Sequence, residues 1–124
     1  MAGIVRDTQV IILEEAEANQ NYNKGYFGQR KGSQLNLDLI EATFLQETGR
    51  LIIKKNGKKL SLPELMNFGI AQHPNFEIGY LVYRDLRRRG YIIRLGKNHQ
   101  FNLYSRGGAP HSPVSYTHLR AHET

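Results

Sequence analysis

The stretch YLVYRDLRRRGYIIRLG, residues 80–96, decides the fold, because a helix ends and a strand begins within it. Apolar residues recur at helical spacing up to this point, so we expect a helix over residues 75–90. Its expected inward side chains are Phe76, Leu81, Val82 and Leu86. Arginines fill the last turn, where cations favour the helix dipole, and Gly90 is typical of a helix end. Residues 91–96 and 100–104 then predict two strands joined by a GKNH turn.

Two further helices are predicted upstream. LNLDLIEATFLQETG, residues 35–49, carries an apolar stripe, and we expect Asn36 to cap its start and Gly49 to end it. SLPE, residues 61–64, is a capping box, in which a serine hydroxyl and a glutamate carboxylate satisfy each other's orphan backbone donors. A helix over residues 62–71 therefore follows it.

Strand signals lie between and before these helices. TQVIIL, residues 8–13, is apolar and rich in β-branched side chains, and residues 51–55 lead into an Asn-Gly hairpin turn. The polar segment EANQNYNKG gives no clear element, and residues 25–34 indicate a loop or short strand. The linker near residues 69–75 is the predicted domain boundary. The pattern predicts an α/β fold of the α+β type.

Composition limits the class of protein. The 124 residues carry 17 basic and 11 acidic side chains, a formal net charge of +6, which favours an anionic partner such as nucleic acid. No apolar run approaches the roughly 20 residues that span a bilayer, and residues 1–15 do not form a signal peptide. We therefore expect a cytoplasmic protein without a membrane partner. The absence of cysteine excludes disulfides and thiolate metal sites.

The stretch HSPVSYTHLRAHET, residues 111–124, raises a separate question. A helix would put His118 and His122 on one face, as a metal site needs, but no third ligand accompanies them. VSYTHLRAHET also resembles a sequencing-library transposon adapter translated in one reading frame. We therefore expect residues 113–124 to be an adapter-derived artefact and residues 114–124 not to pack on the body, with a metal pair as the alternative.

The run D-L-R-R-R-G-Y, the strand end FNLY and the following His-Ser pair resemble the archaeal tRNA-splicing endonucleases, or tRNA-intron endonucleases. In that family a helix ending D-L-R-x-R-G-Y leads into two strands and a loop that carries a histidine. YFGQRKGSQLNLDLIEATFLQETGRLII and SLPELMNFG are similar to its N-terminal domain. The resemblance covers about residues 8–112. It implies an N-terminal α/β domain at residues 1–72 and the first half of a nuclease domain, with a mixed or antiparallel sheet, at residues 73–112.

The resemblance implies an endoribonuclease that cuts precursor tRNA at bulge-helix-bulge motifs without a metal or another cofactor. It would leave a 2′,3′-cyclic phosphate and a 5′-hydroxyl. Tyr104 matches the catalytic tyrosine of the family and His111 its histidine. The third catalytic residue, a lysine, is expected beyond a truncation after Ser112, so this chain alone is expected to be inactive. The family also implies a homo-oligomer, or pairing with a second type of subunit.

These residue types suit the reaction. The nucleophile is the 2′-hydroxyl beside its own phosphate, so it is already positioned. A tyrosine, with an ordinary pKa of about 10, needs a cationic neighbour to accept a proton near neutral pH. An imidazole can donate a proton to the departing 5′-oxygen, and a lysine can stabilise the charge that develops on the phosphate.

Each residue also has a structural interpretation. Tyr104 can serve as packing at a strand end, and His111 as an ordinary surface histidine. We expect Arg87–Arg89 to be a solvated helix end with some ion pairing. The lysines within residues 54–59 are interpreted as charges that keep an edge strand from pairing with other chains. The alternatives for the whole chain are a non-catalytic structural subunit of the same enzyme, or a small basic RNA-binding module.

Overall fold

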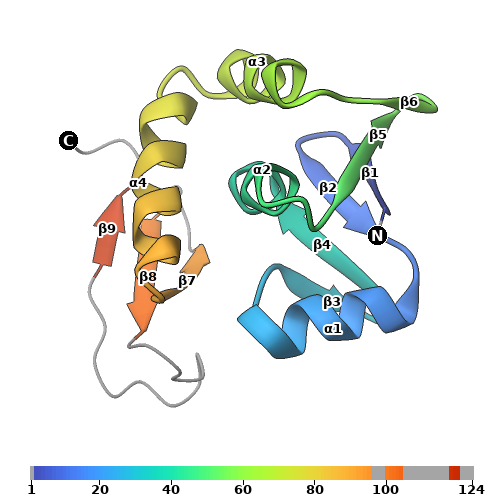
Figure 1. The fold of residues 1–124 in the computed structure, drawn as a ribbon, viewed down its shortest axis with the longest axis horizontal. Coiled ribbons are helices and arrows are strands. Elements are labelled where there is room, and N and C mark those ends of the chain that lie inside the picture. The colour runs from blue at the N-terminus through green and yellow to red at the C-terminus, as the bar shows by residue number, and fades with distance from the viewer. Residues whose placement is uncertain (1, 96–99, 105–117, 121–124) are drawn as a thin grey trace.

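The computed structural model describes residues 2–95, 100–104 and 118–120, which form two β-sheets and a set of helices (Figure 1). The larger sheet contains β1 (Ala2–Arg6), β2 (Gln9–Ile12), β3 (Gln29–Lys31), β4 (Gln34–Asp38), β5 (Ile52–Lys55) and β6 (Lys58–Lys59). The smaller sheet contains β7 (Ile92–Leu95), β8 (Gln100–Tyr104) and β9 (His118–Arg120). The helices are α1 (Glu15–Gly25), α2 (Leu39–Glu47), α3 (Leu62–Gln72) and α4 (Phe76–Arg88).

The two sheets differ in strand direction. The larger sheet has the order β3-β4-β2-β1-β5-β6 and is mixed, because β1 and β5 run parallel while its other pairs are antiparallel. The smaller sheet is antiparallel in the order β7-β8-β9. The predicted α/β fold of the α+β type is confirmed, and the sheet expected after residue 73 is antiparallel.

The larger sheet buries one of its faces. Side chains alternate along each strand, and Val10, Leu37 and Ile53 lie on the face that packs into the core, where all are fully buried. Ile4 and Ile52, on the other face, keep 38% and 42% of their surface exposed. We call this second face the open face.

A series of packed aromatic rings connects the larger sheet to the smaller one. The Phe27 and Phe44 rings stack with centroids 6.1 Å apart, and Phe44 meets Tyr83 edge to face at 5.9 Å. Tyr83 in turn meets Phe101 of β8 at 5.8 Å. A single buried cluster therefore crosses the proposed boundary between residues 72 and 73, and that boundary stays a prediction.

The expected hairpin and the start of α3 are confirmed. Asn56 and Gly57 have φ angles of 52° and 80°, the left-handed conformations of a tight hairpin turn, and β5 pairs with β6 across them. The Ser61 hydroxyl accepts a bond from the Glu64 amide at 3.2 Å, and the Glu64 carboxylate accepts one from the Ser61 amide at 2.9 Å.

Helix α1 was not predicted. Its sequence is polar, but the Glu14 carboxylate caps it by accepting bonds from the amides of Ala16 and Glu17, at 3.2 and 3.0 Å. Ala18 and Asn21 form a narrow buried stripe toward the sheet. The cap and this stripe hold a helix whose apolar periodicity is too weak to find in the sequence.

The predicted start of the helix within residues 35–49 was wrong, because α2 begins at Leu39. Leu35 and Leu37 alternate inward as part of β4, so Asn36 lies in a strand and does not cap a helix. Asp38 is the cap of α2, and its carboxylate accepts a bond from the Ile40 amide at 3.1 Å. The apolar residues of β4 and of α2, which follows it directly, together resemble the apolar stripe of a single helix.

The predicted inward face of α4 was partly wrong. Leu81 is 45% exposed, whereas Tyr80 and Tyr83 are 2% and 0% exposed. Tyr80 donates a hydrogen bond to the Glu47 carboxylate, which also pairs with Arg84 at 3.0 Å. Tyr80 therefore contacts α2 through a hydrogen bond, whereas Tyr83 contacts it through the Phe44 ring.

The expectation that residues 114–124 do not pack was wrong for three of them. His118–Arg120 form β9 and pair with Gln100–Asn102 of β8. No helix in the described part of the chain is long and apolar enough to cross a membrane.

Candidate active site

Tyr104 is the last residue of β8 and lies opposite Ile92 of β7. Its neighbours Phe101 and Leu103 are buried, with exposed fractions of 0% and 8%, and Phe101 packs against α4. Strand alternation therefore puts Tyr104 on the opposite face of this sheet, where its side chain is only half-buried. A phenol in this position can reach a ligand, which a core tyrosine cannot.

Arg94 is a cation on the same sheet face. Arg94 lies opposite Asn102 of β8, and Tyr104 is two residues beyond Asn102 on that strand. Arg94 and Tyr104 are therefore diagonal neighbours, which lie about 7–8 Å apart in a sheet and within reach of long side chains. Its guanidinium donates to the Tyr26 carbonyl and lies 5.8 Å from the Tyr22 ring centroid. Arg94 was not singled out in the sequence, because only the pairing of β7 with β8 brings it next to Tyr104.

Two tyrosines of α4 are excluded as bases. Burial raises the pKa of Tyr83 far above its usual range, outweighing the nearby Arg87. Burial and the neighbouring Glu47 carboxylate raise the pKa of Tyr80 in the same direction. Both phenols therefore keep their protons near neutral pH.

The arginines at the end of α4 differ from one another. Arg89 pairs with Asp85 at 3.1 Å, and both side chains are exposed, as expected for a solvated helix end. Arg87 instead packs inward, and the prediction was wrong for it. Its guanidinium donates to the Tyr83 hydroxyl at 3.1 Å and lies 4.0 Å from the Phe27 ring centroid. Arg87 therefore packs against Tyr83 and Phe27 within the fold.

Glu41 is a buried carboxylate with a structural task. It is 3% exposed, and its oxygens accept bonds from the amides of Gly28 at 2.8 Å and Asp38 at 3.0 Å. Burial raises the pKa of Glu41, although both amide bonds act to lower it. The carboxylate braces the loop before β3 against the start of α2 and is enclosed there.

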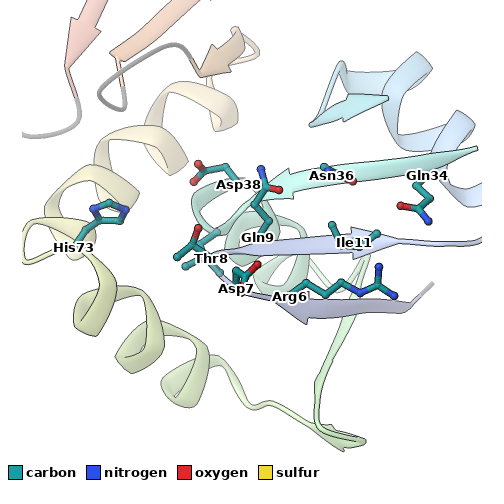
Figure 2. Close-up of a pocket in the computed structure, with 10 residues that line it drawn as sticks. Arg6, Asp7, Thr8, Gln9, Ile11, Gln34, Asn36, Asp38 and His73 are labelled. Carbon is teal, nitrogen blue, oxygen red and sulfur yellow. The ribbon is translucent and has the colours of Figure 1, made fainter. Parts of the chain in front are cut away.

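A polar hollow of about 430 Å³ lies on the open face of the larger sheet (Figure 2). Figure 2 shows Gln9, Asn36 and Asp38 lining it from β2 and β4, with His73 at one end. The Asp38 carboxylate is already engaged as the α2 cap. Besides side-chain amides, the lining carries the charged side chains of Arg6 and Asp7 and the Thr8 hydroxyl.

His111 and His122 lie outside the described residues, so only Tyr104 of the two predicted catalytic residues is located. Within residues 2–95, 100–104 and 118–120, no group of three His, Asp or Glu side chains is placed to hold a metal ion. The His118–His122 pair therefore stays an untested alternative.

The sequence of this chain matches a family model over its first half. The model describes the tRNA intron endonuclease N-terminal domain and matches residues 1–66. The chain belongs to the tRNA intron endonuclease family. The family resemblance in the sequence is thereby confirmed.

Proteins named tRNA-splicing endonuclease are similar to the chain beyond that domain. The protein of Thermococcus onnurineus is 44% identical over 100 residues, 79% of this chain and 58% of that protein. The protein of Thermococcus kodakarensis is 41% identical over 106 residues, 84% of this chain and 63% of that protein. The protein of Sulfurisphaera tokodaii is 35% identical, with 91% of this chain and 71% of that protein covered.

The chain is shorter than these endonuclease family members. It spans less than two thirds of the two Thermococcus proteins and 30% of a tRNA-splicing endonuclease of Methanococcoides burtonii. The family model places residues 1–66 in the N-terminal domain of this family.

Proposed function

We propose that this chain is part of a tRNA-splicing endonuclease subunit that cuts precursor tRNA at bulge-helix-bulge motifs. Tyr104 would be the general base and His111 the general acid. Membership of the tRNA intron endonuclease family is the observation that carries the proposal. The half-buried position of Tyr104, away from the core side of β8, supports its role.

The proposed step needs no metal ion. Tyr104 accepts the proton of the 2′-hydroxyl, whose oxygen attacks the adjacent phosphorus and closes a 2′,3′-cyclic phosphate. The bond from phosphorus to the 5′-oxygen breaks, and His111 donates a proton to that oxygen. Arg94 lies on the same sheet face as Tyr104.

A lysine completes the proposed catalytic set by stabilising the charged transition state. We propose that this lysine comes from a part of the enzyme outside these 124 residues, which span less than two thirds of the two Thermococcus relatives. We expect the 124-residue chain alone not to cleave RNA, because loss of one such group commonly costs about 100- to 1,000-fold in rate. Assembly as a homo-oligomer or with a second subunit type, and a cytoplasmic location, belong to the same proposal.

The test uses the intact subunit and a bulge-helix-bulge RNA, with cleavage and binding measured separately. His111→Ala and Tyr104→Phe should slow cleavage strongly at saturating RNA and leave RNA binding largely unchanged, since proton transfer acts in the transition state. Tyr91→Phe, which removes the hydroxyl of an exposed tyrosine just before β7, is the matched control. Wild-type rates in both site variants would favour the structural-subunit alternative.

A further inference from the structure

The β5–β6 hairpin gathers like charges at one edge of the larger sheet. Lys54 lies directly opposite Lys59, and Lys55 directly opposite Lys58. Opposed like charges destabilise an antiparallel pair. In the described part of the chain, ion pairs join Arg84 of α4 to Glu47 of α2 and Arg89 to Asp85, and neither involves this hairpin. Within that part, no ion pair offsets the repulsion between the opposed lysines.

Two of the four lysines have identified neighbours. The Lys55 ammonium lies 4.4 Å from the centroid of the Phe68 ring on α3. Lys58 acts electrostatically on Glu64, whose carboxylate caps the same helix. Lys54 and Lys59 face each other, and both are exposed. Their pairing needs another explanation.

Lys54 and Lys59 lie on the open face of the sheet. Ile53 is fully buried on the core face, so the next residue, Lys54, points to the open face. Its partner Lys59 shares that face. In β1, Ile4 pairs with Lys54, and Arg6 follows two residues later on the same face. We call Arg6, Lys54 and Lys59 the basic edge.

The basic edge forms a short row of cations. Lys54 and Lys59 are directly opposed on neighbouring strands, which are about 4.8 Å apart. Arg6 lies on the next strand, β1, diagonal to Lys54. Arg6 also lines the polar hollow (Figure 2), but Asp7 and Asp38 line it too. These carboxylates disfavour a phosphate inside the hollow, so an anion is better accommodated along the basic edge.

Protection of an edge strand does not explain the pattern by itself. Any charge on an edge strand discourages pairing with another chain, and an opposed Lys-Glu pair would protect the edge and also stabilise the hairpin. Two opposed lysines beside an arginine protect the edge at a cost in stability. A polyanionic partner would relieve that cost, because it neutralises the cations when it binds.

We propose that the basic edge binds the sugar-phosphate backbone of RNA. The choice of RNA as the polyanion rests on the proposed function. Figure 1 shows the β5–β6 hairpin and β8 at opposite ends of the molecule, so this contact lies on a part of the RNA away from the cut. Lysines act on phosphates as point charges and read no base sequence. The basic edge therefore contributes affinity and orientation without sequence preference.

The test is RNA binding by the full chain over a series of salt concentrations, followed by fluorescence anisotropy. The slope of log affinity against log salt falls by about 1 for each lysine–phosphate contact removed. Lys59→Glu should reduce the magnitude of this slope by about 1, and the double variant Lys54→Glu/Lys59→Glu should reduce it by about 2. The double variant keeps a like-charged pair at the edge, so hairpin repulsion and edge protection stay matched to wild type.

The matched control is Lys31→Glu, which reverses an exposed lysine on β3 at the other edge of the same sheet. It should leave the slope close to the wild-type value. Lys59→Gln repeats the test with the smallest change of charge if the double variant unfolds. Wild-type slopes for the Lys59 variants would overturn the proposal and leave edge protection as the explanation.

The same variants separate this proposal from the proposed function. A reduced salt slope in a protein whose intact subunit cuts no bulge-helix-bulge RNA would support the basic edge and reject the nuclease. Normal cleavage by the intact subunit with an unchanged slope in both Lys59 variants would support the nuclease and reject RNA binding by the basic edge.

Discussion

The guanidinium of Arg87 lies over the ring of Phe27, with its Cζ atom 4.0 Å from the ring centroid. The same group donates hydrogen bonds to the carbonyls of Gly25 at 2.9 Å and Ile93 at 3.2 Å. One side chain of α4 thus ties the end of α1 to β7. The strand pair that carries Tyr104 is therefore fixed to the N-terminal part of the chain by this arginine.

Arg87→Ala should destabilise the fold by about 2–5 kcal/mol, because a hydrogen bond to a charged group is worth about 1.5–3 kcal/mol and a cation–π contact about 0.5–2 kcal/mol, and contributions within one side chain do not add in full. Arg87→Lys should recover little of this loss, since an ammonium cannot reach both carbonyls with a planar fork. The measurement is urea unfolding. Arg88→Ala, at an exposed neighbour, should change the free energy of unfolding by less than about 0.5 kcal/mol, and an equal loss in both variants would contradict the assignment.

Glu41 should make stability depend on pH in an unusual direction. Burial raises its pKa in the folded state above the ordinary value of 4.5, so between the two values the folded state binds more protons than the unfolded state. The free energy of unfolding therefore falls with rising pH in that window. The contribution of Glu41 is fully present below pH 4.5 and is lost as pH rises through the folded pKa.

The measurement is urea unfolding of wild type and Glu41→Gln across this window. The amide side chain of this variant does not titrate, so the stability advantage of wild type over the variant should be largest at low pH and should shrink as pH rises. Glu77→Gln, at an exposed carboxylate of α4, serves as the control. An advantage that grows with pH would mean that the two amide bonds outweigh the burial of the charge.

Two glycines that flank β3 should respond differently to alanine. Both have positive φ, 72° at Gly28 and 62° at Gly32. A Cβ at Gly28 would lie 2.7 Å from the Asn36 carbonyl oxygen, whereas one at Gly32 meets nothing within 4 Å. Gly32→Ala should cost about 1–2 kcal/mol of backbone strain, and Gly28→Ala clearly more, in thermal or urea unfolding. Equal costs would show that β4 yields to the added methyl group.

Local chemistry made much of the fold predictable. The Ser61–Glu64 capping box and the Asn56-Gly57 turn each depend on side-chain and backbone preferences within four residues, and both formed as predicted. The strands β7 and β8 followed from short apolar runs after a helix-ending glycine. Such signals need no knowledge of distant residues.

The failures came from tertiary contacts. Helix α1 depends on a glutamate cap and on Ala18 and Asn21 burying against strands that are distant in sequence. Tyr80 turns inward on α4 because Glu47 of α2 accepts its hydrogen bond. The solvated end predicted at Arg87 fails because the carbonyl of Gly25 lies across from it. Glu47 is far from Tyr80 in the sequence, and Gly25 is far from Arg87.

The candidate site was predictable only through family resemblance. A tyrosine at the end of a short apolar strand is ordinary packing by its local pattern, and nothing in the spacing of Tyr104 and His111 assigns them chemistry. Arg94 became visible as a neighbour of Tyr104 only with the β7–β8 register. Roles in proton transfer depend on such registers, which local periodicity does not give.

The most direct test of the central claim is the end chemistry of a bulge-helix-bulge RNA cut by the intact subunit in excess EDTA. We expect 2′,3′-cyclic phosphate and 5′-hydroxyl ends, and no cutting when the 2′-hydroxyl at the cleavage site is replaced by hydrogen. That replacement removes the nucleophile and leaves the rest of the RNA in place. A requirement for added metal, or products with 3′-hydroxyl and 5′-phosphate ends, would contradict the account.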